Sequence, residues 1–253
     1  MDSHQGAIFF FLAIPVSPRT ICFLVESLTP IALYLTVGFK LLKLKWDNMI
    51  EVEIKCKPTP EEKAALLKDA TFVREEHLID IYYDSTSYEL TTKDFWLRTR
   101  NNKFVLKIPA SSHPLLALQA NTPKHEIEDE EKIRTLLKLS PRGTLHQALE
   151  LASYKPLYTL VKVRQKYTKS GFIIDIDHAT FEDLTFDLLE VETMVETSEE
   201  ISQATQNLIA FVQQHGITPG DIPGNLISLI KIVNPEHFAA LAVARSARVP
   251  HVL

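Results

Sequence analysis

The sequence contains little glycine, and this limits how the chain could bind a phosphate group. Only seven of the 253 residues are glycine, and they form neither a G-x-x-x-x-G-K-[ST] nor a G-x-G-x-x-G pattern. Loops of those types bind phosphate through backbone N–H groups that glycine leaves accessible. If this chain binds phosphate, its side chains have to provide the contacts.

Other motifs and charge patterns are absent as well. The sequence has no G-x-S-x-G, C-x-x-C or H-E-x-x-H motif, and its nine histidines are scattered. Its two cysteines, Cys22 and Cys56, are too few for a disulfide framework or a cysteine-based zinc site, so we expect a cytoplasmic protein. The formal net charge of −5 argues against a nucleic-acid partner, because proteins of that class carry a basic surplus.

Residues 1–48 differ in composition from the rest of the chain. One apolar run of 19 residues, 21–39, is long enough to cross a bilayer, although Glu26 and Pro30 interrupt it. Three interpretations remain: a dispensable extension before a domain that begins at Met49, a membrane anchor, or a segment packed on that domain. If the run is an anchor, the lysines that follow it would keep the domain in the cytosol, and it would be the chain's only membrane contact.

From residue 50 onward the pattern favours strands separated by short helices. A capped helix start is predicted at Thr59-Pro60, with Glu62 completing the capping box, and Asn101-Asn102 predicts a tight hairpin. The expected strands cover 50–57, 77–84, 93–100, 103–108, 124–128, 157–167, 172–178 and 187–194, and the expected longer helices cover 130–139, 145–153 and 198–215. Many antiparallel strands with few long helices favour a barrel or sandwich of the α+β class.

Charged side chains alternate along several of these strands. Residues i and i+2 of a strand share a face, so Glu51, Glu53 and Lys55 project together. The other faces of this kind are Arg98 with Arg100, Lys103 with Lys107, Lys162 with Arg164 and Lys166, Asp175 with Asp177, and Glu190 with Glu192. A single such strand is typical of a sheet with one face in water, but their number here indicates a shared role.

The two signs of charge complement each other chemically. Acidic pairs such as Glu51 with Glu53, or Glu190 with Glu192, repel one another unless a cation lies between them, and carboxylate oxygens suit Mg²⁺. Arginine and lysine side chains on the other strands suit phosphate oxygens. A closed barrel with these faces turned inward would bind a polyanion together with its metal ion.

The order of these motifs resembles that of the CYTH superfamily of triphosphate tunnel metalloenzymes. The matching segments are E-V-E-I-K (51–55), Y-Y-D (82–84), W-L-R-T-R (96–100), F-V-L-K (104–107), H-E-I-E (125–128), V-R (163–164), I-D-I-D (174–177) and E-V-E (190–192). The resemblance implies an eight-stranded antiparallel β-barrel that forms a tunnel with flanking helices, a domain over 49–250. It also implies a bound divalent metal, Mg²⁺, with Mn²⁺ able to replace it.

The resemblance further implies roles for individual residues. The metal is expected to bind to five carboxylates: Glu51, Glu53, Asp175, Glu190 and Glu192. The expected catalytic residues are Glu53, Lys55 and Glu190. Side chains that contact the substrate are expected at eight positions: Lys55, Trp96, Arg98, Arg100, Lys107, Glu126, Arg164 and Asn225.

Two positions bear on the branch of the family. Trp96 directly precedes L-R-x-R, which resembles the thiamine triphosphatase branch, where a tryptophan at this place stacks on the thiamine ring; the alternative is an aromatic residue of the barrel core. Asn225 stands where the family carries a phosphate-binding lysine, which implies weaker binding or lower activity. Lys231 lies six residues further on, and six residues do not bring it to the same helix face.

The sequence therefore predicts a monomeric, magnesium-dependent hydrolase that converts thiamine triphosphate to thiamine diphosphate. Two alternatives remain open: an inorganic triphosphatase of the same fold, and a tunnel protein that binds polyphosphate or a nucleotide without turnover. A lipocalin-like barrel needs an apolar lumen, which the charged strand faces contradict.

Overall fold

The computed structural model describes residues 49–110 and 122–247 of the chain. All of them belong to one compact unit, Trp46–Leu253. The predictions made for residues 1–48, including the apolar run 21–39, lie outside the described residues. Within the described part of the chain, none of the helices has both the length and the apolar character that a membrane span requires.

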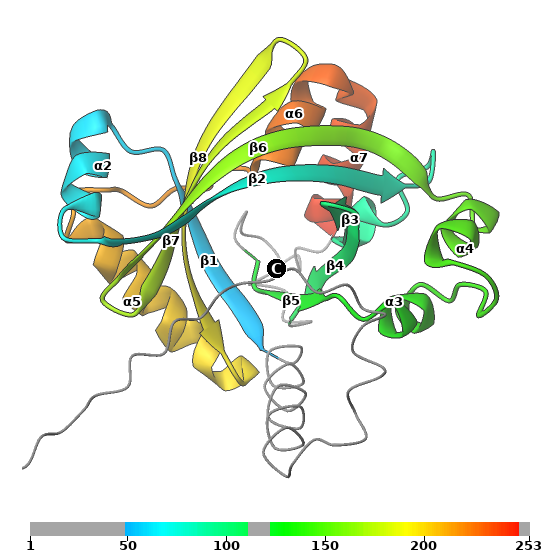
Figure 1. Ribbon diagram of the computed structural model, residues 1–253, viewed down its shortest axis with the longest axis horizontal. Helices are drawn as coiled ribbons and strands as arrows, with labels where there is room; N and C mark the ends of the chain where they lie inside the picture. Colours follow the sequence, from blue (N-terminus) through cyan, green and yellow to red (C-terminus); the bar gives the residue numbers. More distant parts are fainter. Residues whose placement is uncertain (1–48, 111–121, 248–253) are drawn as a thin grey trace, which may run out of the picture. The chain divides into compact units, whose positions relative to one another are not determined.

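Eight antiparallel strands close into a barrel, which confirms the predicted fold class (Figure 1). Their order around the barrel is β1-β5-β4-β3-β2-β6-β7-β8, so the first and last strands of the unit are neighbours. The strands are β1 (Ile50–Cys56), β2 (Thr71–Asp84), β3 (Trp96–Arg100), β4 (Lys103–Pro109), β5 (Lys124–Ile127), β6 (Lys155–Lys169), β7 (Phe172–Phe181) and β8 (Leu184–Val195).

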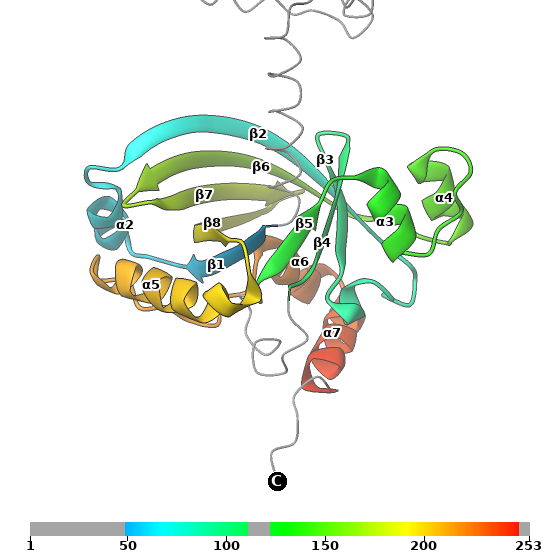
Figure 2. The same ribbon diagram turned by 90° about the horizontal axis from the view of Figure 1, so that it is seen from below.

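Helices flank the barrel, as the sequence predicted. In Figure 2, α5 runs alongside β1, while α3 and α4 lie beyond β4 and β5. The helices are α2 (Pro60–Leu67), α3 (Glu130–Leu136), α4 (Leu145–Leu151), α5 (Ile201–Gln213), α6 (Asn225–Val233) and α7 (Pro235–Ala247), with the 3-10 helices η3 (Thr91–Lys93) and η5 (Ser198–Glu200).

Where α5 covers β1, the apolar face of the strand points outward, toward the helix, and the charged face points inward. Val52 and Ile54 of β1 pack in a buried cluster with Leu208 of α5. Because side chains alternate along a strand, Glu51 and Glu53 project to the other side, into the barrel. Burial of apolar surface between barrel and helices therefore fixes which face of each strand lines the interior.

Local sequence signals fix the ends of several elements. Thr59 forms the predicted capping box at the start of α2, and Thr144 forms a second one at the start of α4. Asn101 and Asn102 both adopt positive φ, 48° and 67°, and join β3 to β4 as a two-residue turn. Asn tolerates this conformation better than most residues do, which is why the hairpin could be predicted.

Several predicted boundaries differ from the structure; for example, β7 ends at Phe181 rather than at residue 178, and β8 begins at Leu184 rather than at residue 187. β2 begins at Thr71 rather than at residue 77, because its exposed first half pairs with β6 and has no alternating apolar face. Residues 91–93 form η3, and Asp94 follows with a left-handed φ of 64°, so β3 begins only at Trp96. The helix expected over 198–215 is divided into η5 and α5.

A buried hydrogen-bond network attaches α7 to the barrel. The two ring nitrogens of His237 lie 2.7 Å from Thr91 Oγ1 and 2.9 Å from the Tyr158 hydroxyl. Thr91 Oγ1 donates to buried Asp84, and Asn234 Nδ2 donates to the Tyr158 hydroxyl. Burial lowers the pKa of His237 despite the nearby Asp84 carboxylate, so the ring is held neutral.

Candidate active site

The barrel encloses a cavity of about 470 Å³ that is lined mainly by charged side chains. All eight strands contribute to its wall, together with α6 and α7, and ten basic and eight acidic side chains of residues 49–110 and 122–247 face it. The predicted site residues on this wall are Glu51, Glu53, Lys55, Trp96, Arg98, Arg100, Lys107, Glu126, Arg164, Glu190, Glu192 and Asn225. Asp175 is the one predicted site residue that does not line it.

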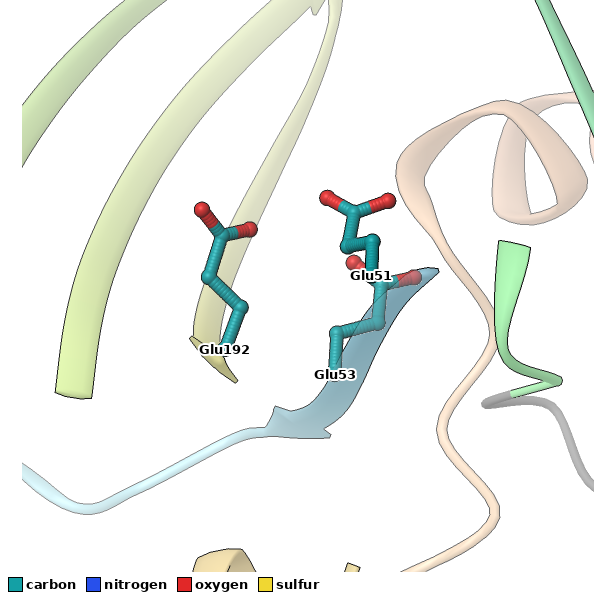
Figure 3. Close-up of side chains that lie close together, drawn as sticks. All are labelled: Glu51, Glu53 and Glu192. Carbon is teal, nitrogen blue, oxygen red and sulfur yellow. The ribbon is translucent and has the colours of Figure 1, made fainter. Parts of the chain in front are cut away.

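Three carboxylates of β1 and β8 form an acidic cluster (Figure 3). Glu53 and Glu192 are register partners on the two strands, and Glu51 projects from the same face of β1. One oxygen of each carboxylate lies within 4.8 Å of the others. Burial raises the pKa of Glu192 well above its usual range, and repulsion by Glu51 and Asp175 raises it further. Burial likewise raises the pKa of Glu51, despite the attraction of Lys107.

This set of donors fits a hard divalent cation. Ca²⁺ and Mg²⁺ both prefer oxygen ligands, and Mg²⁺ commonly binds one or two carboxylates together with waters and substrate phosphates. An ion between Glu51, Glu53 and Glu192 would remove the mutual repulsion of the buried carboxylates. Glu53 is ionised in any case, because Lys55 and Lys107 outweigh its burial and lower its pKa to about 2.

The other two predicted metal ligands contact cations in this structure. The Glu190 carboxylate accepts a hydrogen bond from Arg164 Nη2 at 2.8 Å and lines the cavity beside Lys55, whose Nζ is 4.0 Å away. Asp175 is fully buried behind the wall, where it contacts Arg164 and lies 2.8 Å from Lys166 Nζ. The predicted metal contact of these two carboxylates stays a prediction.

A buried aspartate that the sequence analysis missed holds three cations together. Asp80 is fully buried and accepts two hydrogen bonds from Arg100, at 2.8 and 2.9 Å. Lys162 Nζ lies 3.1 Å from the same carboxylate, and Arg98 Nη1 lies 3.7 Å from it. Burial opposes the charge, but the attraction of Arg98, Arg100 and Lys162 holds the pKa of Asp80 far below its usual range.

Arg164 is fixed by carboxylates on several sides. Its Nε and Nη2 donate to the two oxygens of Asp177, its register partner on β7, at 2.5 and 2.7 Å. Nη1 donates to Asp175 at 2.5 Å, and Nη2 donates to Glu190. A guanidinium held in this way has a defined position before any ligand arrives. The sequence placed Asp177 on a charged face but gave it no role.

Lys107 of β4 connects the acidic cluster to Glu126 of the neighbouring strand β5. Its Nζ lies 2.5 Å from Glu51 Oε2 and 2.9 Å from Glu126 Oε1. Glu126 also accepts a hydrogen bond from Arg98, at 3.4 Å. Because Lys107 and Arg98 outweigh its burial, the pKa of Glu126 is lowered to about 2. Lys107, which was predicted to contact phosphate, thus forms a direct ion pair with Glu51 of the acidic cluster.

One part of the cavity wall is apolar. Trp96 lies here with Leu226 of α6 and with Phe238 and Leu241 of α7, all in one apolar cluster that reaches the cavity. The Trp96 indole N–H donates to the Asp94 carboxylate at 2.7 Å, which fixes the ring. The contribution of α7 could not be predicted, because a sequence pattern does not show on which face of a barrel a helix packs.

Comparisons with known proteins agree with this architecture. A family model described as the CYTH domain matches residues 49–222. The PH1819 protein of Pyrococcus horikoshii OT3 has a similar fold, with a TM-score of 0.53 and 24% identity over 72% of this chain and 98% of its own. No curated protein sequence matches the chain significantly.

Two further solved structures show weaker similarity. A proposed adenylate cyclase from Vibrio parahaemolyticus has a TM-score of 0.48 and 16% identity, and the match covers 71% of this chain and 97% of that protein. A proposed adenylyl cyclase from Hippeastrum, described as having a dominant triphosphatase activity, has a TM-score of 0.44 and 18% identity over 75% and 99%. At these identities the similarity concerns the fold alone.

Proposed function

Because the chain belongs to the CYTH domain family, we propose that it is a magnesium-dependent phosphohydrolase that converts thiamine triphosphate to thiamine diphosphate. The observation that carries the proposal is the convergence of an acidic cluster and a basic wall in one cavity of the barrel. Phosphoryl transfer has a loose transition state with charge spread over the phosphoryl oxygens. Positioned cations and a metal ion therefore supply most of the acceleration.

The balance of charge in the cavity supports binding of a metal-bound triphosphate. Ten basic side chains face eight acidic ones, and the buried carboxylates of Asp80 and Asp175 contact the basic wall from behind. A free triphosphate would therefore meet cations that are already neutralised and carboxylates that repel it. A divalent ion on the acidic cluster removes that repulsion, so we expect substrate and metal to bind together.

Distinct residues would hold the phosphates and orient the attacking water. Arg98, Lys107 and Arg164 present N–H donors to the cavity and would grip phosphate oxygens. Glu53, ionised because its pKa is lowered to about 2, can accept a hydrogen bond from the water that attacks the terminal phosphorus in line. When bound, Mg²⁺ would neutralise charge on the phosphate oxygens.

The apolar part of the wall supports an organic triphosphate rather than an inorganic one. Trp96 has its indole N–H fixed by Asp94 and stands beside Phe238 and Leu241. An aromatic side chain in such a place can stack on a flat cationic ring such as thiazolium. Inorganic tripolyphosphate has no group that would use this surface.

A substrate panel tests the proposal. The full chain should release phosphate from thiamine triphosphate in the presence of Mg²⁺ faster than from tripolyphosphate or ATP. Trp96→Ala should lower kcat/KM for thiamine triphosphate about 10-fold through the lost ring contact, while Trp96→Phe should retain most of it. Tripolyphosphate turnover should not depend on the ring at position 96.

The other possible outcomes of the substrate panel lead to different conclusions. Phosphate release no faster than that of Glu53→Ala would contradict hydrolysis. Preference for tripolyphosphate would assign an inorganic triphosphatase instead. Tight binding by calorimetry without turnover would indicate a tunnel that only binds, and Asn225 in place of the family's lysine is the feature that favours this second candidate.

A further inference from the structure

The start of α6 opens into the cavity. Gly224, Asn225, Leu226 and Ile227 all line it. The first backbone hydrogen bond of this nine-residue helix runs from Ser228 N to Gly224 O, at 3.0 Å. The three preceding N–H groups have no acceptor within the helix. The first turn contains no acidic residue and the N-cap Gly224 offers no side chain, so the positive end of the helix is not neutralised locally.

Asn225 adds an independent observation. Its side chain is only 8% exposed and belongs to the cavity wall. Its Nδ2 has no hydrogen-bond partner among residues 49–110 and 122–247. A buried N–H₂ group without an acceptor is unfavourable, and native proteins rarely leave one unless a ligand, ion or water satisfies it. The Asn225 side-chain amide and the first N–H groups of α6 therefore lie close together, and neither has an acceptor within the helix or the described cavity wall.

Lys55 of β1 lies close to this place. A Cβ at Gly224 would lie 3.4 Å from Lys55 Cε, so the Lys55 side chain lies directly against the helix start. Lys231 of α6 is exposed, with its ammonium 5.8 Å from the Phe238 ring centroid, and it is not part of the cavity wall.

We propose that the N-terminus of α6, the Asn225 amide and Lys55 form a phosphate subsite in which most donors are uncharged. The subsite binds the phosphoryl oxygens that lie between the acidic cluster and the apolar wall around Trp96, because Lys55 contacts Glu53 and Leu226 packs with Trp96. The inference rests on the proposed triphosphate substrate. Neutral donors fit this cavity, because its fixed charges are already nearly balanced.

Two variants separate this role from a structural one. Asn225→Asp keeps the shape but presents a carboxylate to the phosphate, while an acidic residue in the first helical turn favours the helix. Gly224→Ser lets a side chain cap the same amides internally, which also favours the helix. Both variants should keep or raise Tm, yet bind inorganic tripolyphosphate about 10-fold more weakly, because hydrogen bonds to an anion are lost.

The experiment is calorimetry of the full chain with tripolyphosphate and Mg²⁺, together with thermal unfolding of each variant. Asn207→Asp, which makes the same substitution at an exposed site on α5, is the matched control and should bind as the wild type does. If the wild type binds and both variants stay within about twofold of it, the subsite is refuted and the proposed function stands. If the wild type itself does not bind, the proposed function and the subsite both fail.

Discussion

Replacing the buried Asp80 by asparagine tests whether the basic wall depends on one carboxylate. Asp80 is fully buried, binds Arg100 through two hydrogen bonds and lies close to Lys162 and Arg98. Removing one partner of a buried ion pair costs about 3–5 kcal/mol, because the remaining charges lose their compensation. Asparagine preserves one acceptor for Arg100, so we expect a loss near the lower limit, about 3 kcal/mol.

For a domain of this size, a loss of about 3 kcal/mol corresponds to a fall in Tm of about 6–12 °C. Urea unfolding in a phosphate-free buffer measures the free energy directly, and Asp183→Asn, at an exposed turn between β7 and β8, is the matched control. The control should change the free energy of unfolding by less than about 0.5 kcal/mol.

A second arm of the same experiment uses the ligand. Without the Asp80 carboxylate, the three cations have charge left for phosphate, so tripolyphosphate with Mg²⁺ should narrow the gap in Tm between variant and wild type. A loss no larger than that of the exposed control would refute the view that Asp80 organises the basic wall. If tripolyphosphate leaves the difference in Tm between variant and wild type unchanged, the cations that contact Asp80 do not face the ligand.

Two further predictions concern the acidic cluster and α7. Glu192→Gln should raise Tm in the absence of metal, because one of the repelling carboxylates is gone. The variant should also show a smaller increase in Tm on addition of Mg²⁺; for the wild type, the ion at 100 times its Kd stabilises the fold by about 2.7 kcal/mol. An unchanged response to Mg²⁺ would show that the ion binds elsewhere. The buried His237 ring has a lowered pKa, so the unfolded chain takes up its proton first, and stability present above pH 6.5 should be lost as the pH falls below it. Between pH 7.5 and 5.5, the free energy of unfolding measured with urea should fall by about 1 kcal/mol more in the wild type than in His237→Phe. An equal dependence of this free energy on pH in the two proteins would refute the prediction.

Much of the fold could be predicted from the sequence, because the period of two along each strand shows which residues share a face. Glu51, Glu53 and Lys55 alternate with apolar residues, and the same apolar residues pack against α5. Which side becomes the interior is decided by the helices, whose amphipathic faces need an apolar partner. The strand pattern therefore predicted a barrel or sandwich with charged strand faces, and the resemblance to the CYTH superfamily narrowed this to a closed barrel with a charged lumen.

Individual side-chain contacts within the site could not be predicted from the sequence. Asp80 is one of four acidic residues of β2, and only the register that makes it the partner of Arg100 reveals its role. Asp94 occupies a left-handed backbone position in a segment that the pattern assigned to a strand, which hid its contact with Trp96. Such contacts depend on register and chain reversal, and neither follows from periodicity.

The neighbourhood of β1 and β8 has a consequence for folding. Glu51 and Glu53 come from the first strand of the barrel and Glu192 from the last, so more than a hundred residues must be arranged before the three carboxylates meet. Chain connections of that span are slow to form. A divalent ion that binds only the assembled cluster would thus stabilise the pairing of β1 with β8, which closes the barrel. A stopped-flow signal from metal binding during refolding would show when this pairing forms.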